Sequence, residues 1–167
     1  MTDIEKIIEL LELRPHPKEG GYFAEIYRST DKLKAGCLSG RYETDKSLAT
    51  SIYYLLTADT KSELHRLKSD EIFHFYLGDP VEMVNLYPDG KSESVTLGAD
   101  IFNDQKVQHL VPKDVWQGAI LAPGGEFALL GTTMAPCFDY DDYESADREE
   151  LIAKYPEHKK IIEKLTG

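Results

Sequence analysis

The amino-acid sequence predicts an all-β protein, either a sandwich or a barrel, with short helices at both ends. An opening helical pattern gives way to many short β-rich runs separated by turn residues, and a helical pattern returns near the C-terminus. Short strands at regular spacing are typical of β-sandwiches and β-barrels. We therefore expect one domain over residues 1–167, with an N-terminal helix in 1–14, a barrel over 20–138 and C-terminal helices over 145–166.

Apolar residues at helical spacing predict the first helix: Ile4, Ile7, Ile8 and Leu11. Thr2 and Glu5 are spaced as a capping box at its N-terminus. The segment Arg14-Pro15-His16-Pro17 ends the helix, because each proline lacks an N–H donor and disfavours the helical conformation of the residue before it.

The β-rich runs are bounded by turn formers such as Gly78-Asp79-Pro80 and Pro123-Gly124-Gly125. They cover residues 22–29, 48–57, 71–77, 81–86, 107–111, 115–121 and 127–133. The polar segment 31–46 is expected to form a surface loop or flap. Near the C-terminus, Ser145 is expected to cap a helical run through Leu151, and Pro156 to begin a last helix.

The overall charge excludes some classes of partner. The chain has 167 residues, with 19 Lys and Arg against 30 Asp and Glu, so its formal charge is −11. Nucleic-acid binding depends mainly on basic side chains, so we expect no nucleic-acid partner. The first residues lack the basic and apolar parts of a signal peptide, and no run approaches the ~18 apolar residues of a membrane helix. We expect no membrane partner, a cytoplasmic location, and free thiols at the distant Cys37 and Cys137.

The segment 62–78 carries the residues best suited to chemistry. His65 precedes a turn, Glu71 opens the next strand and Gly78 ends it. This order resembles the first motif of the cupins, small jelly-roll barrels in which two histidines and a glutamate place metal ligands inside the barrel. Leu67 stands where the second histidine of that motif would be.

A second segment, residues 111–117, resembles the second cupin motif, Pro-x-Gly-x-x-His. Pro112 matches, Asp114 replaces the glycine and Gln117 replaces the histidine. The sequence thus lacks two of the four usual cupin ligands.

Several further blocks together resemble one cupin branch, called cupin family five. The blocks keep a specific order over roughly residues 13–156: 17–23, 26–29, 50–53, 65–71, 116–117 and 135–139. The resemblance implies an all-β jelly-roll cupin barrel, or double-stranded β-helix, forming a single domain with short flanking helices. It implies no particular reaction, because cupins include dioxygenases, isomerases, epimerases and binding proteins.

The cupin spacing predicts that His65 and Glu71 form a catalytic pair inside the barrel. An imidazole beside a carboxylate in a mostly apolar cavity can act as a general base or general acid. A carboxylate that merely satisfies a partly buried imidazole is the alternative. Other histidines, His16, His74 and His109, are expected to be satisfied structural residues.

Further residues are expected to bind the ligand. Gln117 would orient it by hydrogen bonding, and Arg66 would contact an anionic group, unless it pairs with a nearby carboxylate. Strand alternation places Phe73 and Phe75 on the face of Glu71, where flat apolar walls suit a small organic molecule.

A tight transition-metal site needs at least three protein ligands. The sequence therefore predicts no cofactor, although His65, Glu71 and Gln117 could hold a divalent metal weakly.

We interpret the sequence as a protein that binds a small polar organic molecule, such as a sugar derivative or carboxylic acid, and as a metal-independent isomerase or epimerase. A ligand-binding cupin without turnover and a metal-dependent dioxygenase-type cupin are the alternatives. A homodimer is also expected, in which the strand near residues 22–29 extends the partner's sheet, because its edge would otherwise be exposed.

Overall fold

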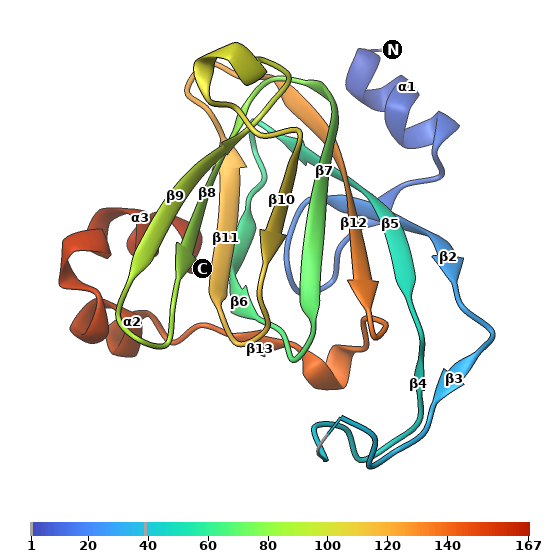
Figure 1. The fold of residues 1–167 in the computed structure, drawn as a ribbon. Coiled ribbons are helices and arrows are strands. Elements are labelled where there is room, and N and C mark those ends of the chain that lie inside the picture. The colour runs from blue at the N-terminus through green and yellow to red at the C-terminus, as the bar shows by residue number, and fades with distance from the viewer. Residues whose placement is uncertain (1, 39) are drawn as a thin grey trace.

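Two antiparallel β-sheets face each other across the centre of the protein (Figure 1). The computed structural model describes residues 2–38 and 40–167. The first sheet has six strands, in the order β1 (Arg14–Pro15), β2 (Tyr22–Arg28), β5 (Thr50–Thr57), β12 (Phe127–Ala135), β7 (Asp70–Gly78) and β10 (Gln108–Val111). The second sheet has five, in the order β13 (Glu144–Ser145), β6 (Ser62–Arg66), β11 (Trp116–Leu121), β8 (Val81–Leu86) and β9 (Ser92–Leu97). The predicted all-β jelly-roll fold is confirmed.

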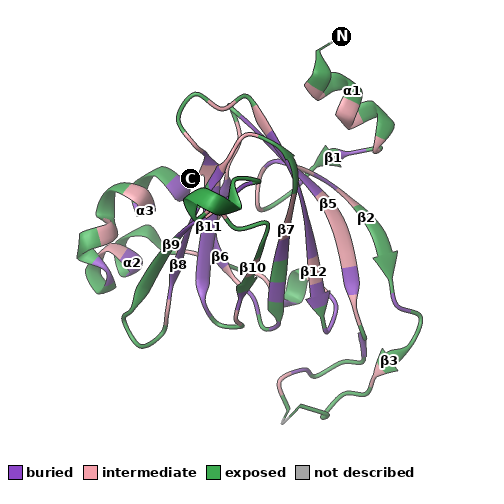
Figure 2. Ribbon diagram, turned by 45° about the horizontal axis from the view of Figure 1, so that its top comes forward, coloured by how far each residue is buried: buried purple, intermediate pink, exposed green. Residues whose placement is uncertain are grey.

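Side-chain alternation along the strands builds the interior between the sheets. On β7, Glu71 and Phe73 are buried, whereas Asp70 and Ile72 are exposed, as period-two alternation requires. Figure 2 shows the buried residues, in purple, concentrated on strands of the two sheets. The main apolar cluster includes Phe73, Leu130 and Val81, and it fills much of the space between the sheets.

The N-terminal helix α1 (Asp3–Leu10) packs on the outer face of the six-stranded sheet. The Thr2 side chain accepts a hydrogen bond from the Glu5 N–H at 3.2 Å, and Glu5 Oε2 accepts from the Thr2 N–H at 2.8 Å. The predicted capping box is therefore confirmed. The apolar stripe of the helix packs against a small cluster centred on Leu55 and Leu129.

Two C-terminal helices, α2 (Arg148–Lys154) and α3 (Lys159–Leu165), cover the five-stranded sheet, with the 3-10 turn η3 (Pro156–His158) between them. The prediction that Ser145 caps α2 is wrong. Ser145 lies in strand β13, and Asp147 caps the helix by accepting the Glu150 N–H at 2.9 Å.

The polar segment predicted as a loop or flap forms an extended arm. Two short strands, β3 (Lys32–Leu33) and β4 (Lys46–Ser47), pair at its base. The buried ammonium of Lys46 anchors it, lying 2.8 Å from Asp139 and 2.9 Å from Asp142. Asp142 belongs to the 3-10 turn η2 (Tyr140–Asp142).

All seven predicted strands match observed ones within two residues. The strands β6 and β9, and the two-residue strands β1, β3, β4 and β13, were not among the predicted runs. A further 3-10 turn, η1 (Ile101–Asn103), follows β9. Cys37 is exposed, Cys137 is buried, and both are free thiols, as predicted. Over residues 2–38 and 40–167, no helix has the length and apolar character needed to cross a membrane.

Candidate functional site

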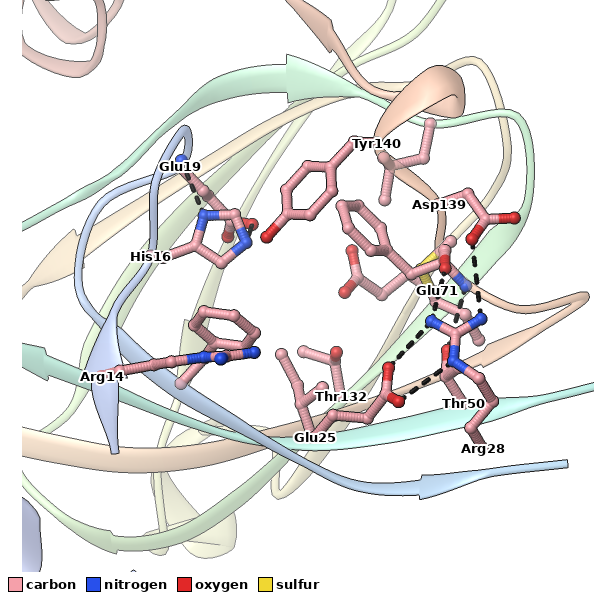
Figure 3. A pocket seen from close by; sticks show the side chains of 15 residues that line it. Arg14, His16, Glu19, Glu25, Arg28, Thr50, Glu71, Thr132, Asp139 and Tyr140 are labelled. Carbon is pink, nitrogen blue, oxygen red and sulfur yellow. Dashed lines mark hydrogen bonds and ion pairs between the residues drawn. The ribbon is translucent and has the colours of Figure 1, made fainter. Parts of the chain in front are cut away.

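A cavity of about 240 Å³ opens between the β2 end of the six-stranded sheet and the η2 segment (Figure 3). Its wall combines apolar residues with an unusual number of ionisable side chains. The ionisable and phenolic side chains are Arg14, His16, Glu19, Glu25, Arg28, Glu71, Asp139 and Tyr140. The volume lies just below the ~300–1,000 Å³ range of ligand pockets, so the site suits a small organic molecule.

The turn between β1 and β2 places His16 and Glu19 in this wall. Gly20 and Gly21 have φ values of +92° and +68°, a region that side chains disfavour. A Cβ on Gly20 would lie 2.3 Å from the Lys61 carbonyl oxygen, and one on Gly21 would lie 2.7 Å from that of Leu55. The two glycines therefore allow this turn to pass against β5 and β6.

Backbone hydrogen bonds fix the proton of His16 on one ring nitrogen. His16 Nδ1 accepts the Glu19 backbone N–H at 2.8 Å, so the neutral ring carries its proton on Nε2. Nε2 lies 4.0 Å from Glu19 Oε2. Burial lowers the pKa of His16, although the Glu19 charge acts in the opposite direction. His16 thus presents an N–H donor beside Glu19.

Glu19 lies between two imidazoles. Its Oε2 is 4.0 Å from His16 Nε2 and 3.9 Å from His65 Nε2, and its Oε1 accepts a hydrogen bond from Ser62 Oγ at 2.7 Å. Burial raises the pKa of Glu19, because the charged form loses hydration, while His16 and the Ser62 hydrogen bond oppose this shift.

Glu71 enters the cavity from the second position of β7. Gln117, on β11 of the opposite sheet, donates Nε2–H to Glu71 Oε2 at 2.8 Å, so this hydrogen bond joins the two sheets. Burial and then the charge of Glu19 raise the pKa of Glu71 to about 7, against the opposing effects of His65, Thr132 and Gln117. Glu71 can therefore both give and take a proton near neutral pH.

His65 has the opposite proton arrangement to His16. Its Nδ1 lies 2.6 Å from the Glu63 carbonyl oxygen, which can only accept, so Nδ1 carries the proton and Nε2 keeps a free electron pair. Nε2 is buried and has no hydrogen-bond partner among the described residues. Burial lowers the pKa of His65, and its ring stacks on Tyr143 with 4.8 Å between centroids.

Comparison of the sequence with known protein families shows which family it belongs to. The sequence model of the family described as Cupin superfamily (DUF985) matches residues 5–146. This chain belongs to that cupin family.

Relatives of this cupin cover most of its length. The uncharacterized protein YML079W of Saccharomyces cerevisiae is 31% identical over 150 residues, which are 85% of this chain and 74% of that protein. The crystal structure of protein SO0799 from Shewanella oneidensis is similar with a TM-score of 0.85 at 34% identity, covering 100% of this chain and 99% of that one. A hypothetical protein from Leishmania major has a TM-score of 0.88 at 30% identity, covering 99% of each chain.

The structure brings His65, Glu71 and Gln117 together, but at different depths. Glu71 forms part of the cavity wall, whereas His65 and Gln117 lie behind it. The carboxylate within 4 Å of the His65 ring is that of Glu19, at 3.9 Å, not that of Glu71. Sequence reasoning therefore missed Glu19, and it assigned His16 a structural role although His16 lines the cavity.

Arg66 pairs with a carboxylate, which is the alternative to ligand contact that the sequence left open. Its guanidinium makes two hydrogen bonds of 2.8 Å to the Glu144 carboxylate and lies 4.6 Å from the Trp116 ring centre. Arg66 is not part of the cavity wall. The ion pair joins β6 to β13 on the outside of the sheet.

Phe73 and Phe75 also lie away from the cavity wall. Phe73 is 1% exposed within the main apolar cluster, and Phe75 packs against that cluster. The expectation that they line the ligand is corrected, because the core fills this part of the space between the sheets. His74 and His109 are satisfied, as predicted, by Thr133 at 3.0 Å and Asn85 at 2.8 Å respectively.

The residues of this cupin do not fit a transition metal well. Among the described residues, no group of three or more His, Cys, Asp and Glu side chains could hold a metal ion. Leu67, at the position of the second motif histidine, is an apolar part of the cavity wall. Gln117 directs its amide nitrogen, a donor, at Glu71. The site is better arranged for proton transfer and hydrogen bonding.

Proposed function

We propose that this protein is a metal-independent isomerase or epimerase that acts on a small polar organic molecule bound in the cavity. The observation that carries the proposal is Glu71, a buried carboxyl at the cavity wall whose pKa is raised to about 7. A general acid or base works best when its pKa lies near the working pH.

Glu71 would take a proton from a carbon next to a carbonyl group of the ligand. The C–H bond breaks, its electron pair moves onto the carbonyl oxygen as an enolate, and the carboxyl holds the proton. Return of a proton to the opposite face gives the epimer. Where the deprotonated carbon carries a hydroxyl, the hydroxyl proton can instead pass to the enolate oxygen, and return of the first proton to the former carbonyl carbon then gives the isomer, with the new carbonyl at the carbon that carried the hydroxyl. No atom is gained or lost and no oxidant is needed. The Nε2–H of His16 is a donor at this wall for an oxygen of the ligand.

The second carboxyl supports proton return. Glu19 also lines the cavity, its pKa is raised by burial, and it contacts both imidazoles. The unprotonated Nε2 of His65 can receive a proton from Glu19, so we assign His65 as a positioning and proton-holding residue behind the wall. Gln117 holds Glu71 in place through their 2.8 Å hydrogen bond.

Exchange of carbon-bound hydrogen with solvent tests this proposal before the substrate is known. The protein is incubated in D₂O with aldoses, ketoses, and hydroxy and keto acids, and deuterium uptake beside the carbonyl is followed by NMR. We expect uptake in at least one compound, and a loss of ~100-fold or more in Glu71→Gln, since general acid–base catalysis contributes ~10²–10⁴-fold. Glu82→Gln, an exposed carboxylate on β8, is the matched control and should keep the activity.

Compounds that bind in the cavity without taking up deuterium would favour the second candidate, a ligand-binding cupin without turnover. The observation that favours it is that Gln117 occupies one Glu71 oxygen at 2.8 Å. Exchange that disappears with a chelator and returns with a divalent metal would overturn the metal-independent mechanism.

A further inference from the structure

Two arginines line the cavity, and they differ in their partners. Arg28 is fully engaged: it donates two hydrogen bonds to Glu25, at 3.0 and 2.8 Å, and one to the Phe138 carbonyl at 3.0 Å, and it lies 3.5 Å from Asp139. Arg14 lies 5.0 Å from the centre of the Phe23 ring. Within the described residues, no carboxylate lies within ion-pair distance of Arg14. Arg14 is therefore a cation at the cavity that has no ion-pair partner among the described residues.

Two further donors lie beside Arg14. His16 presents its Nε2–H, because its Nδ1 is occupied by the Glu19 backbone N–H. The phenol of Tyr140 lies close to His16, with 6.0 Å between the ring centroids. Figure 3 shows the ends of Arg14, His16 and Tyr140 directed toward the same side of the cavity. A guanidinium, an imidazole N–H and a hydroxyl are the donors that recognise a carboxylate.

The two acidic wall residues nearest Arg28 are already paired with cations. Glu25 and Asp139 are both paired with Arg28, and Asp139 is also paired with Lys46 at 2.8 Å. Lys18 adds positive charge at the same rim, with its ammonium 5.5 Å from the Tyr140 ring centre. The remaining carboxyls, Glu19 and Glu71, have raised pKa values because they are buried.

We propose that Arg14, with His16 and Tyr140 beside it, binds the carboxylate of a small organic acid, whose carbon skeleton then extends toward Glu71. This inference rests on the proposed function, since it names the class of molecule that the same cavity takes. A planar carboxylate matches the fork of a guanidinium, and the neighbouring Phe23 ring offers a flat apolar wall. The cavity, at about 240 Å³, has room for such a molecule, since benzene occupies an engineered cavity of ~150 Å³ in another protein.

Benzoate and benzamide test the proposal, because they share a ring and differ in the charge of the polar group. Dissociation constants are measured by NMR titration of the ¹⁵N-labelled protein. We expect benzoate to bind about tenfold or more tightly than benzamide, and Arg14→Gln to remove that preference, since a charged hydrogen bond contributes ~1.5–3 kcal/mol, or about 10–100-fold. Arg14→Lys should keep part of it, because the charge remains while the fork is lost.

Arg66→Gln is the charge-matched control, because it removes an arginine outside the cavity, and it should leave benzoate affinity unchanged. The amide spectra of the variants show directly whether the fold is kept. Equal binding of the two probes, or a preference that survives Arg14→Gln, would overturn the role of Arg14. Tighter binding of inorganic phosphate than of benzoate would overturn the carboxylate class.

Failure of both probes to bind would also overturn the inference. It would leave the proposed function to be judged by deuterium exchange and Glu71→Gln, which do not depend on the charge of the ligand.

Discussion

At the scale of single residues, the cavity depends on two carboxyls, Glu19 and Glu71, which are buried close enough for the charge of one to raise the pKa of the other. Ionising both groups in a site of low dielectric constant costs more free energy than ionising either one alone, because the two negative charges repel each other. Their protons are therefore held more tightly than in water. Groups with separated or raised pKa values are the ones that exchange protons during catalysis near neutral pH.

The raised pKa of Glu71 predicts a measurable pH dependence of stability. Its pKa moves from 4.5 in the unfolded chain to about 7 in the folded protein. Between these values the folded state binds more protons, so the free energy of unfolding falls as the pH rises, and the fall ends above pH ~7. The difference amounts to at most ~3 kcal/mol for this residue. Glu71→Gln should remove this part of the slope in urea unfolding followed by Trp116 fluorescence.

The buried histidines contribute to the pH dependence of the free energy of unfolding with the opposite sign. Burial lowers the pKa of His16 and His65, so their contribution to stability is lost as the pH falls below 6.5. Comparing Glu71→Gln with the wild type cancels the contribution of His16, while that of His65 changes, because the Glu71 charge raises the pKa of His65. Glu82→Gln should keep the wild-type slope. Parallel slopes for the wild type and Glu71→Gln would show that Glu71 is ionised in the folded protein throughout this range.

The sequence alone predicted Glu71 and its neighbour Gln117 at the site, because strand alternation and the cupin spacing can both be recognised in short stretches of sequence. His16 and Glu19 could not be found in this way. They lie in a turn without periodicity, and their position depends on the approach of Gly20 and Gly21 to the backbone of Lys61 and Leu55. The block of residues 17–23, which contains Glu19 and directly follows His16, was the signal that could have pointed to them. Arg66 was misplaced because nothing local shows that Glu144 folds back beside it.

At the scale of elements, the strands with alternating apolar residues were predictable, and those that depend on neighbours were not. Strand β9 is mostly exposed and polar, and it is a strand because it pairs with β8. Strand β6 buries Ser62 and His65, so its polar residues hide the pattern of an interior strand. The cap of α2 was displaced to Asp147 because Ser145 pairs with His65 in β13.

The arm between β3 and β4 is joined to the cavity by a buried cation. Lys46 is only 4% exposed, and it pairs with Asp142, also 4% exposed, and with Asp139 in the cavity wall. Burial alone would lower the pKa of Lys46, but its hydrogen bonds to Asp139 and Asp142 outweigh this and raise it to about 12. Removal of the ammonium would leave the buried Asp142 carboxylate with the more distant Lys68, at 3.8 Å, as its remaining cation in the described part of the chain.

Lys46→Met should therefore lower the free energy of unfolding by ~3 kcal/mol, as expected when one member of a buried ion pair is removed. Adding Asp142→Asn should recover part of the loss, because the uncompensated charge is removed. Urea unfolding measures both. Lys34→Met is the control on the same arm: its pair with Asp45, at 2.7 Å, is exposed, and its loss should hardly change stability. Equal losses of unfolding free energy in Lys46→Met and Lys34→Met would contradict the conclusion that the buried Lys46 ammonium anchors the arm.

At the scale of the whole molecule, strand β2 leaves part of the six-stranded sheet unpaired. One of its edges pairs with β5 from Tyr22 to Arg28, and the other pairs with β1 only at Tyr22 and Phe23. In the described part of the chain, no other strand covers that second edge beyond Phe23. Ile26 and Tyr27, on this open part, are 52% and 54% exposed. An open edge with apolar side chains is a surface on which another strand can pair.

We expect the protein to form a homodimer through this edge, with β2 of each copy extending the sheet of the other, because a two-fold axis places identical edges side by side. Light scattering after size exclusion should give twice the mass of the chain. Lysine on an edge strand opposes such pairing, so Ile26→Lys combined with Tyr27→Lys should give a monomer. Phe102→Lys is the control, since Phe102 is 94% exposed on η1 and is not part of β2. A monomeric wild type would contradict the prediction. A dimer that survives the paired lysines would show that the interface lies on another surface. Hydrogen exchange gives a second test: if the interface lies on β2, the amides of residues 24–28 should be protected in the wild type and lose that protection in the double variant.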